Sequence, residues 1–164
     1  MTKPLKPFSM PNPAHGPKPP DSGWPTPEPG DVLSYSYLWA REAANGQPEG
    51  LKDRPVVVVV ARIEAKGRTE LVVAPVTHSV PTSEAGTLEM PANVKRDLKL
   101  DRERSWIVLT EVNRFNWPGP DIRPVGANGD PYYGAIPDWL LVNVRDAIGE
   151  RARAGKMRVT KRGE

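Results

Sequence analysis

Asp53-Arg54-Pro55 and the five consecutive valines that follow, at 56–60, decide the fold of this chain. Five β-branched residues without a polar interruption favour a strand that is buried on both faces, at the centre of a sheet. A second apolar stretch ends in Ala74-Pro75-Val76-Thr77-His78, and a turn at 65–68 separates the two stretches. The pattern therefore predicts a hairpin of two strands, over 54–63 and 69–77.

Outward from this hairpin, alternating apolar and polar residues predict further short strands at 31–39, 86–90 and 105–115. The segment 40–52 contains an Asn-Gly pair and a second glycine, and is expected to be a loop. A short helix is predicted at 91–98 and the main helix at 137–152. These elements predict a mainly β fold, a small half-open β-barrel with a short helix and a C-terminal helix that closes it.

Composition divides the chain of 164 residues into three parts. Residues 1–29 hold ten of the 20 prolines, which allow neither a helix nor a sheet ladder, so we expect a disordered lead in which Trp24 docks on the domain. Residues 30–150 form the barrel domain. Residues 151–164 are expected to be a basic flexible tail, since 149–164 holds six basic and two acidic residues. Such a tail either attracts nucleic acid without reading its sequence or simply stays solvated.

Several classes of site are excluded by what the chain lacks. Without cysteine there is neither a disulfide nor a thiolate metal site, and the two histidines stand in no cluster with metal-ligand spacing along the sequence. Neither a glycine-rich strand-to-helix loop nor a Gly-x-Ser-x-Gly elbow occurs. We therefore expect no metal and no cofactor. The sequence also has no apolar run of membrane-spanning length and no secretory signal, which predicts a soluble, cytoplasmic protein.

The strongest candidates for chemistry are Arg54 and Thr77. In an antiparallel hairpin the start of one strand lies beside the end of the next, so the two side chains are expected to be close. A guanidinium with a neighbouring hydroxyl can hold a phosphate and stabilise the charge that develops during its transfer. In the alternative reading, Arg54 forms a surface ion pair with Asp53, Glu111 or another carboxylate, and Thr77 is an ordinary strand residue.

Further polar and aromatic residues are candidates for substrate binding. His78 and Ser79 follow the second hairpin strand, and the strand predicted at 105–115 has a polar face that indicates a groove. The full set is His78, Ser79, Glu111, Asn113, Arg114 and Trp117. Along a strand His78 faces away from Thr77, so a capping role is an equal alternative. The aromatic ring of Trp117 either stacks on a base or anchors its loop in the core.

With Arg54-Pro55 before the valines and Pro75-Val76-Thr77 at the end of the next strand, the chain resembles the PemK/MazF family of toxin endoribonucleases. Pro29-Gly30-Asp31-Val32 is similar to the opening strand motif of that family, and Trp106-Ile107-Val108-Leu109-Thr110-Glu111-Val112 is similar to a later strand. The resemblance covers residues 29–150 and rests on the order and spacing of these motifs.

This resemblance implies an SH3-like half-open barrel of the PemK/MazF/CcdB type, usually a homodimer, that cleaves single-stranded RNA such as mRNA without a metal. The 2′-hydroxyl attacks the adjacent phosphorus and leaves a 2′,3′-cyclic phosphate. Arg54 would act as general acid or base and stabilise the charged phosphorane, and Thr77 would hold a phosphate oxygen. A cognate antitoxin, the partner in a type II toxin–antitoxin system, would fill the groove with its flexible tail.

The alternative function is that of a non-catalytic binding module built on the same barrel. It would bind a protein target, as the related CcdB toxins poison gyrase, or bind nucleic acid without cutting it. The net charge of −2 between the lead and the basic end of the chain, and the unfamiliar loop after Trp117, favour this alternative. Arg54 and Thr77 favour the nuclease.

Overall fold

The computed structural model describes residues 24–164 except 65, 83, 126–128 and 163–164. The prediction of a disordered lead therefore falls largely on residues outside the described part. Trp24, at its described end, is buried, and its ring centroid lies 6.2 Å from that of Trp117. The hydroxyl of Tyr132 donates a hydrogen bond to the carbonyl oxygen of Pro25. The predicted docking of Trp24 on the domain is confirmed.

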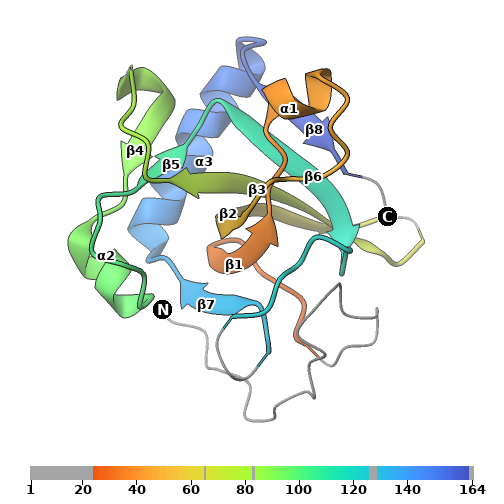
Figure 1. The fold of residues 1–164 in the computed structure, drawn as a ribbon, viewed down its shortest axis with the longest axis horizontal. Helices are drawn as coiled ribbons and strands as arrows, with labels where there is room; N and C mark the ends of the chain where they lie inside the picture. The colour runs from red at the N-terminus through yellow and green to blue at the C-terminus, as the bar shows by residue number, and fades with distance from the viewer. Residues whose placement is uncertain (1–23, 65, 83, 126–128, 163–164) are drawn as a thin grey trace.

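The described part of the chain is mainly β, with eight strands, one 3₁₀ turn and three helices (Figure 1). In chain order the elements are β1 (Asp31–Ser36), α1 (Ala40–Ala44), β2 (Asp53–Ile63), β3 (Thr69–Thr77), η1 (Glu84–Gly86), β4 (Thr87–Glu89), α2 (Ala92–Asp97), β5 (Trp106–Val108), β6 (Glu111–Trp117), β7 (Tyr132–Ala135), α3 (Asp138–Arg153) and β8 (Arg158–Lys161).

All eight strands belong to one sheet, with the predicted β2–β3 hairpin at its centre. On one side β1 pairs with β2, and β7 pairs with β1. On the other side the sheet divides along β3, because β6 pairs with its first half whereas β5 pairs with its last two residues. The pairs are antiparallel except β6–β8, and the sheet does not close into a barrel. The mainly β class is thus confirmed, and the closure that the barrel prediction included is absent from the described strands.

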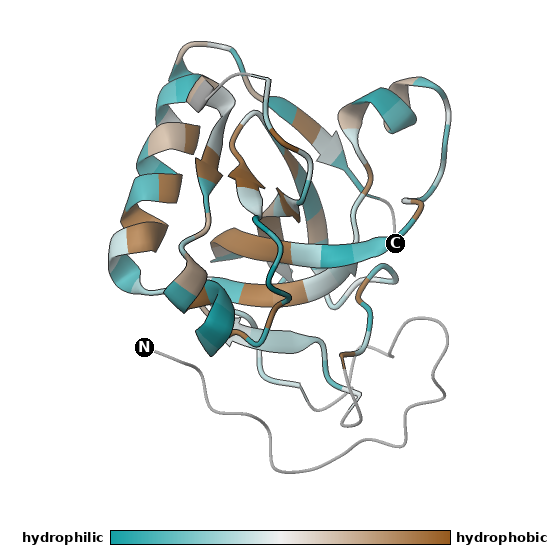
Figure 2. Cartoon of the chain, turned by 60° about the vertical axis from the view of Figure 1, so that its left-hand side comes forward, coloured by the Kyte–Doolittle hydropathy of each residue, from teal (hydrophilic) through white to brown (hydrophobic). Residues whose placement is uncertain are grey.

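The valine run of β2 is buried on both faces, as predicted. Val57 and Val59 face one core, which α3 covers with its apolar side, whereas Val56 and Val58 face an aromatic core that contains Tyr35. Figure 2 shows the hydrophobic residues of α3 turned toward the sheet. Each buried valine contributes about 1.5–3 kcal/mol, so this strand anchors both layers and holds its polar first residues in a fixed place.

Two segments differ from the sequence predictions. The expected loop at 40–52 begins with the short helix α1, whose start is closed by Glu42, because a carboxylate oxygen of this residue accepts a hydrogen bond from the Trp39 N–H at 3.1 Å. The expected flexible tail at 151–164 instead completes α3 and adds β8 along β6, as far as the structure describes it.

Arg162 explains why the C-terminal segment is ordered. Its side chain is buried, forms an ion pair of 2.8 Å with Asp121, and donates a hydrogen bond of 2.8 Å to the carbonyl oxygen of Ser36. A basic residue that was predicted to lie in a solvated tail therefore links the end of β8 to β1 and to the loop after β6.

Among the described residues, no helix combines the length and apolarity that a membrane crossing requires.

Candidate functional site

Arg54 and Thr77 lie opposite each other where the β2–β3 hairpin opens. The printed register pairs Val56 with Pro75 and Val57 with Ala74, and the same register carried two residues further sets Arg54 opposite Thr77. Because side chains alternate along strands, both residues lie on the face that Val56 and Pro75 share. Arg54 Nη1 also donates a hydrogen bond of 3.4 Å to the carbonyl oxygen of Val76. The structure therefore brings the two predicted residues together.

A cavity of about 400 Å³ opens beside this pair, and His78 from the end of β3 also lines it. Its other charged lining residues are Lys52, Asp53, Lys99 and Asp101. Both carboxylates already have cationic partners, since Asp53 lies 3.6 Å from Arg123 and Asp101 lies 2.9 Å from Lys95. The charge left for a ligand is positive, which suits an anion.

Arg54 has no carboxylate partner among the residues that the structure describes. Asp53 pairs with Arg123, and Glu111 accepts hydrogen bonds from the Tyr37 hydroxyl and the Ala40 N–H at 3.1 and 2.9 Å. Arg54 Nε is buried and has no hydrogen-bond partner within the described part. Leaving a buried donor unsatisfied costs about 1–3 kcal/mol, so such a donor points to a ligand that completes it. Among the described residues, neither Asp53 nor Glu111 forms the surface ion pair considered as the alternative role of Arg54.

Trp39 supports the guanidinium instead. The carbon at the centre of the Arg54 guanidinium lies 5.1 Å from the centroid of the Trp39 ring, and Arg41 lies 5.4 Å from the same ring. Burial lowers the pKa of Arg54, and the nearby carboxylate of Glu42 partly offsets that effect. Arginine remains charged under these conditions, and its charge acts more strongly on a ligand in a half-buried site than in water.

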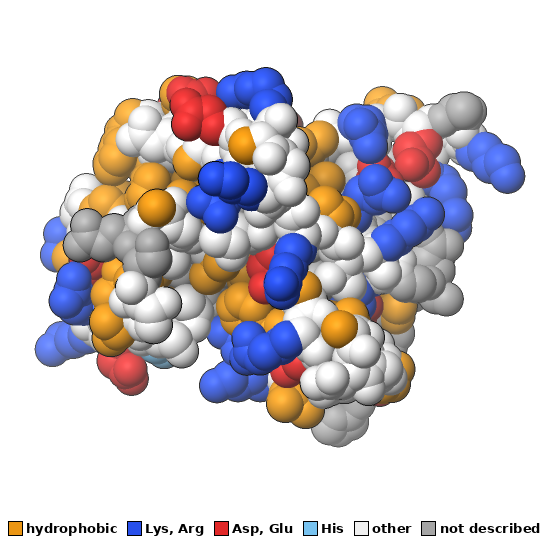
Figure 3. Space-filling model, turned by 90° about the horizontal axis from the view of Figure 1, so that it is seen from above, with side chains coloured by type: hydrophobic (Ala, Val, Ile, Leu, Met, Phe, Trp, Pro, Cys, Tyr) orange, Lys and Arg blue, Asp and Glu red, His pale blue; other side chains and the backbone are white. Residues whose placement is uncertain are grey.

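Thr77 joins this cavity to a second one of about 510 Å³, because it lines both. Trp39, Arg41 and Arg151 line the second cavity, so cations stand on both sides of Thr77. Figure 3 views the end of the molecule that carries α1 and the last turn of α3, where Lys and Arg side chains predominate over Asp and Glu, with hydrophobic side chains between them. Thr77 Oγ1 accepts a hydrogen bond from the Ser79 N–H at 3.1 Å, which leaves its own proton for a ligand.

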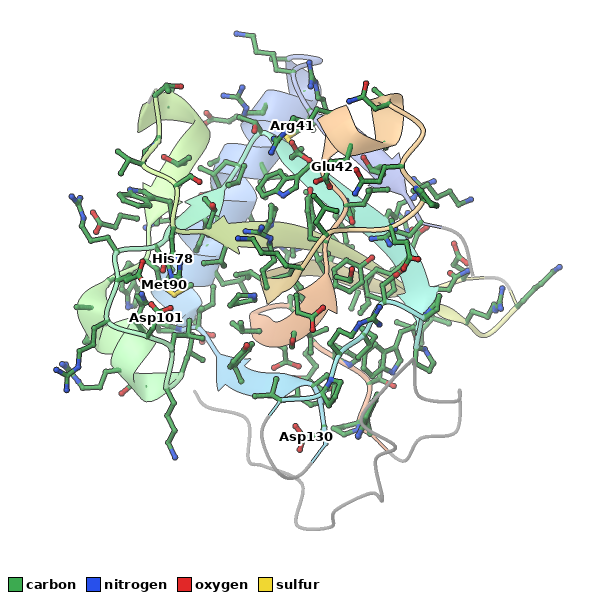
Figure 4. All side chains as sticks on the ribbon, in the orientation of Figure 1. Arg41, Glu42, His78, Met90, Asp101 and Asp130 are labelled. Carbon is green, nitrogen blue, oxygen red and sulfur yellow. The ribbon has the colours of Figure 1, made fainter. Side chains whose placement is uncertain are left out.

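His78 has two acidic neighbours that linear spacing did not predict. Its Nε2 lies 3.0 Å from a carboxylate oxygen of Asp101, and its Nδ1 lies 3.8 Å from one of Glu103. Figure 4 shows His78 and Asp101 beside each other near α2. Partial burial opposes ionisation of Asp101, but the hydrogen bond from Lys95 and the charge of His78 outweigh it and lower the pKa of Asp101. Spacing along the sequence gave no sign of this group, because the folded chain brings His78 together with residues more than 20 positions away.

The remaining candidates are used by the fold. Glu111 holds Tyr37 and Ala40, as described above, and Trp117 packs in the aromatic core between Trp24 and Tyr132. Asn113 is fully buried; its side chain accepts a hydrogen bond from the Leu38 N–H and donates one to the Leu38 carbonyl oxygen.

Arg114 forms an ion pair of 3.2 Å with Glu70. Ser79 is exposed and lines the second cavity. Of the six residues proposed for substrate binding, His78 and Ser79 therefore lie along the two cavities. The described lining of these cavities does not include Glu111, Asn113, Arg114 or Trp117.

Sequence reasoning missed several lining residues, chiefly Trp39, Arg41, Lys52, Lys99 and Arg151. Arg41 and Lys52 lie within the segment 40–52 that was predicted to be a loop, Trp39 directly precedes it, and Arg151 was assigned to the tail. Nothing in the sequence distinguished Lys99. In the structure its φ is 58°, a backbone conformation that is unfavourable for a residue with a side chain.

No protein-family model matches this chain, and no curated protein matches it. The function is therefore inferred from the geometry of these residues.

Proposed function

We propose that this protein is a metal-independent endoribonuclease that cleaves single-stranded RNA, the toxin of a type II toxin–antitoxin system. The observation that carries the proposal is the half-buried guanidinium of Arg54, which has no ion-pair partner among the described residues and lines the same cavity as Thr77. Cation and hydroxyl together suit a phosphate group, because both can donate to its oxygens.

The charges around the cavity suit a polyanionic chain rather than a single small anion. Lys52 and Lys99 line the first cavity, and Arg41 and Arg151 line the second. A strand of RNA that passes Thr77 would place one phosphate on Arg54 and its neighbours on these outer cations. The face of Trp39 offers a surface for base stacking, which tolerates any base sequence.

Cleavage would follow from how the phosphate is held. The 2′-oxygen of the preceding ribose attacks phosphorus, its proton passes to solvent, and the bond from phosphorus to the 5′-oxygen breaks. The products are a 2′,3′-cyclic phosphate and a 5′-hydroxyl. Arg54 would stabilise the extra negative charge of the phosphorane, and its guanidinium would donate a hydrogen bond to the leaving oxygen, which takes its proton from solvent. Thr77 would hold one phosphate oxygen, so that the attacking 2′-oxygen, the phosphorus and the leaving 5′-oxygen lie in line.

The finer expectations about fold and partners belong to the same proposal. We propose that the open sheet is a variant of the SH3-like PemK/MazF barrel, that the protein is a homodimer, and that a cognate antitoxin neutralises it in the cytoplasm. Light scattering at micromolar concentration tests the dimer directly, because a monomer would contradict it.

One observation favours the alternative of a non-catalytic module that binds nucleic acid or a protein target such as gyrase. Among the described residues, neither an imidazole nor a carboxylate is hydrogen-bonded to Arg54 or Thr77, so a preformed general base is not in contact with them. A nuclease of this kind would depend mainly on charge stabilisation and positioning.

The test that separates the two functions uses chimeric oligonucleotides. RNA strands with a single 2′-deoxynucleotide at each position in turn are incubated with the protein in EDTA. The nuclease proposal predicts that each deoxynucleotide blocks cleavage only at its own 3′-phosphate, because the attacking hydroxyl is missing there. Binding without cleavage of any strand would support the alternative.

A further inference from the structure

We propose that His78, Asp101 and Glu103 form a binding site for a divalent transition metal, best suited to Zn²⁺, at the rim of the first cavity. Figure 4 labels His78 and Asp101 of this group. The site is distinct from Arg54 and Thr77 and does not depend on the proposed function. His78 follows β3, whereas the two carboxylates lie on the loop between α2 and β5.

The spacing of the donor atoms fits one ion. One ligand atom from each residue lies within 4.8 Å of the others, and the closest nitrogen–oxygen pair, from His78 to Asp101, is 3.0 Å apart. Tetrahedral zinc with bonds of about 2.0–2.2 Å holds its ligands about 3.4 Å from one another. Small rotations of exposed side chains would reach this geometry, because the Glu103 side chain is 74% exposed and the His78 side chain 47%.

Lys95 holds the acidic loop in place behind the site. Its buried ammonium group donates hydrogen bonds to Asp101 Oδ1 at 2.9 Å, to Ser105 Oγ at 2.8 Å and to the Glu103 carbonyl oxygen. The Glu103 N–H donates to the same Asp101 oxygen at 3.1 Å. Both carboxylate oxygens of Asp101 lie near His78 Nε2, Oδ1 at 3.1 Å and Oδ2 at 3.0 Å. Because Oδ1 also accepts from Lys95 and from the Glu103 N–H, Oδ2 is the oxygen left for a metal ion. Carboxylates that bind metals are commonly held in position by hydrogen bonds from groups behind them. Lys95 and the Glu103 N–H hold Asp101 in this way.

Charge and ligand type point to the same class of ion. Two carboxylates stand against the single ammonium of Lys95, which leaves a net negative charge when His78 is neutral. One imidazole with two carboxylates suits Zn²⁺ better than Mg²⁺ or Ca²⁺, which prefer oxygen ligands alone. Three protein ligands leave one position for water or an anion. Because His78 and Asp101 line the cavity, a phosphate oxygen of a bound ligand could reach that position.

Zinc binding to the full-length protein, measured by calorimetry without RNA, tests the proposal. We expect one Zn²⁺ per chain, and binding about tenfold or more weaker for His78→Gln and for Glu103→Gln. His15→Gln is the matched control, because it removes the other histidine of the chain and should leave the affinity unchanged. Co²⁺ should give a visible absorption spectrum that the His78→Gln variant lacks.

Two results would overturn the metal site. One is the absence of saturable 1:1 binding up to millimolar Zn²⁺, and the other is equal affinity for the parent and the His78→Gln variant. Both substituted side chains are exposed, so the variants should keep the unfolding midpoint of the parent. Since RNA is absent from the assay, failure of the metal site and failure of the nuclease proposal are separate outcomes.

Discussion

The guanidinium of Arg54 lies 5.1 Å from the ring centroid of Trp39, and this stacking takes the place of an ion pair with a carboxylate. An ion pair would fill the donors of the arginine, whereas a ring leaves them directed at a ligand. Trp39 also lines the second cavity, so one side chain both supports the cation and borders the path beyond Thr77.

Replacing Trp39 with Ala should therefore weaken nucleic-acid binding by about 30-fold or more, because cation–π support and base stacking are each worth about 1–2 kcal/mol and both would be lost. Fluorescence anisotropy with a DNA oligonucleotide, which the protein cannot cleave by 2′-hydroxyl attack, measures this effect. Trp139→Ala is a suitable control, since that ring is 54% exposed on α3. Equal losses for the two variants would contradict the role given to Trp39.

Lys52 and Lys99 should act on binding through charge alone. Replacing either with Gln is expected to reduce the slope of log affinity against log salt by about 0.7, the value for one phosphate contact on a single strand. Arg104→Gln provides the comparison, because Arg104 already pairs with Glu89 at 2.7 Å. The cavity would not be the binding path if Arg104→Gln changed the slope as much as the lysine variants.

Arg162 should be needed for stability although it lies next to the C-terminus. Arg162→Ala leaves Asp121 without its partner in a largely buried place and is expected to lower the free energy of unfolding by about 3 kcal/mol. Arg158→Ala, at an exposed position of the preceding strand β8, should change it by less than about 0.5 kcal/mol. Urea unfolding measures both variants, and similar values would mean that β8 does not depend on the buried Arg162 side chain.

Asp101 should make stability depend on acid pH. Lys95 and His78 lower its pKa below the ordinary 3.8, against the effect of burial, so the folded state favours the charged form. This contribution is complete above the unfolded-state pKa and is lost as the pH falls through the lower folded-state pKa. Between pH 5 and 2.5, the parent should therefore lose unfolding free energy more steeply than Asp101→Asn. Parallel curves for the two proteins in urea unfolding would exclude this linkage.

The sequence predicted the centre of the fold well and its margins poorly. The valine run and the turn after it specify the β2–β3 hairpin, because only a fully buried strand accommodates such a run. The proximity of Arg54 and Thr77 was predicted from strand pairing alone. In contrast, β8 has mostly exposed residues and pairs in parallel with a distant strand, so its short basic sequence carries no alternation that would indicate a strand.

The functional candidates divide in the same way. Asn113 resembled a groove residue because a polar side chain interrupted an apolar strand, yet its amide satisfies the backbone of Leu38 in the interior. The sequence pattern of a strand cannot distinguish a buried polar side chain that bonds the backbone from one that contacts a ligand, since both place polar atoms among apolar ones. The group of His78, Asp101 and Glu103 is assembled by tertiary structure and has no counterpart in linear spacing.

The central claim is that Arg54 and Thr77 hold and cleave RNA without a metal. Its most direct test is the rate at which the pure protein cleaves single-stranded RNA in EDTA, compared with Arg54→Ala, Thr77→Ala and the control Arg62→Gln at the far end of β2. The account predicts 2′,3′-cyclic phosphate ends from the parent and the control, and rates at least about 10²-fold lower for Arg54→Ala and about tenfold lower for Thr77→Ala. No cleavage by the parent, or equal rates for the parent and Arg54→Ala, would contradict it.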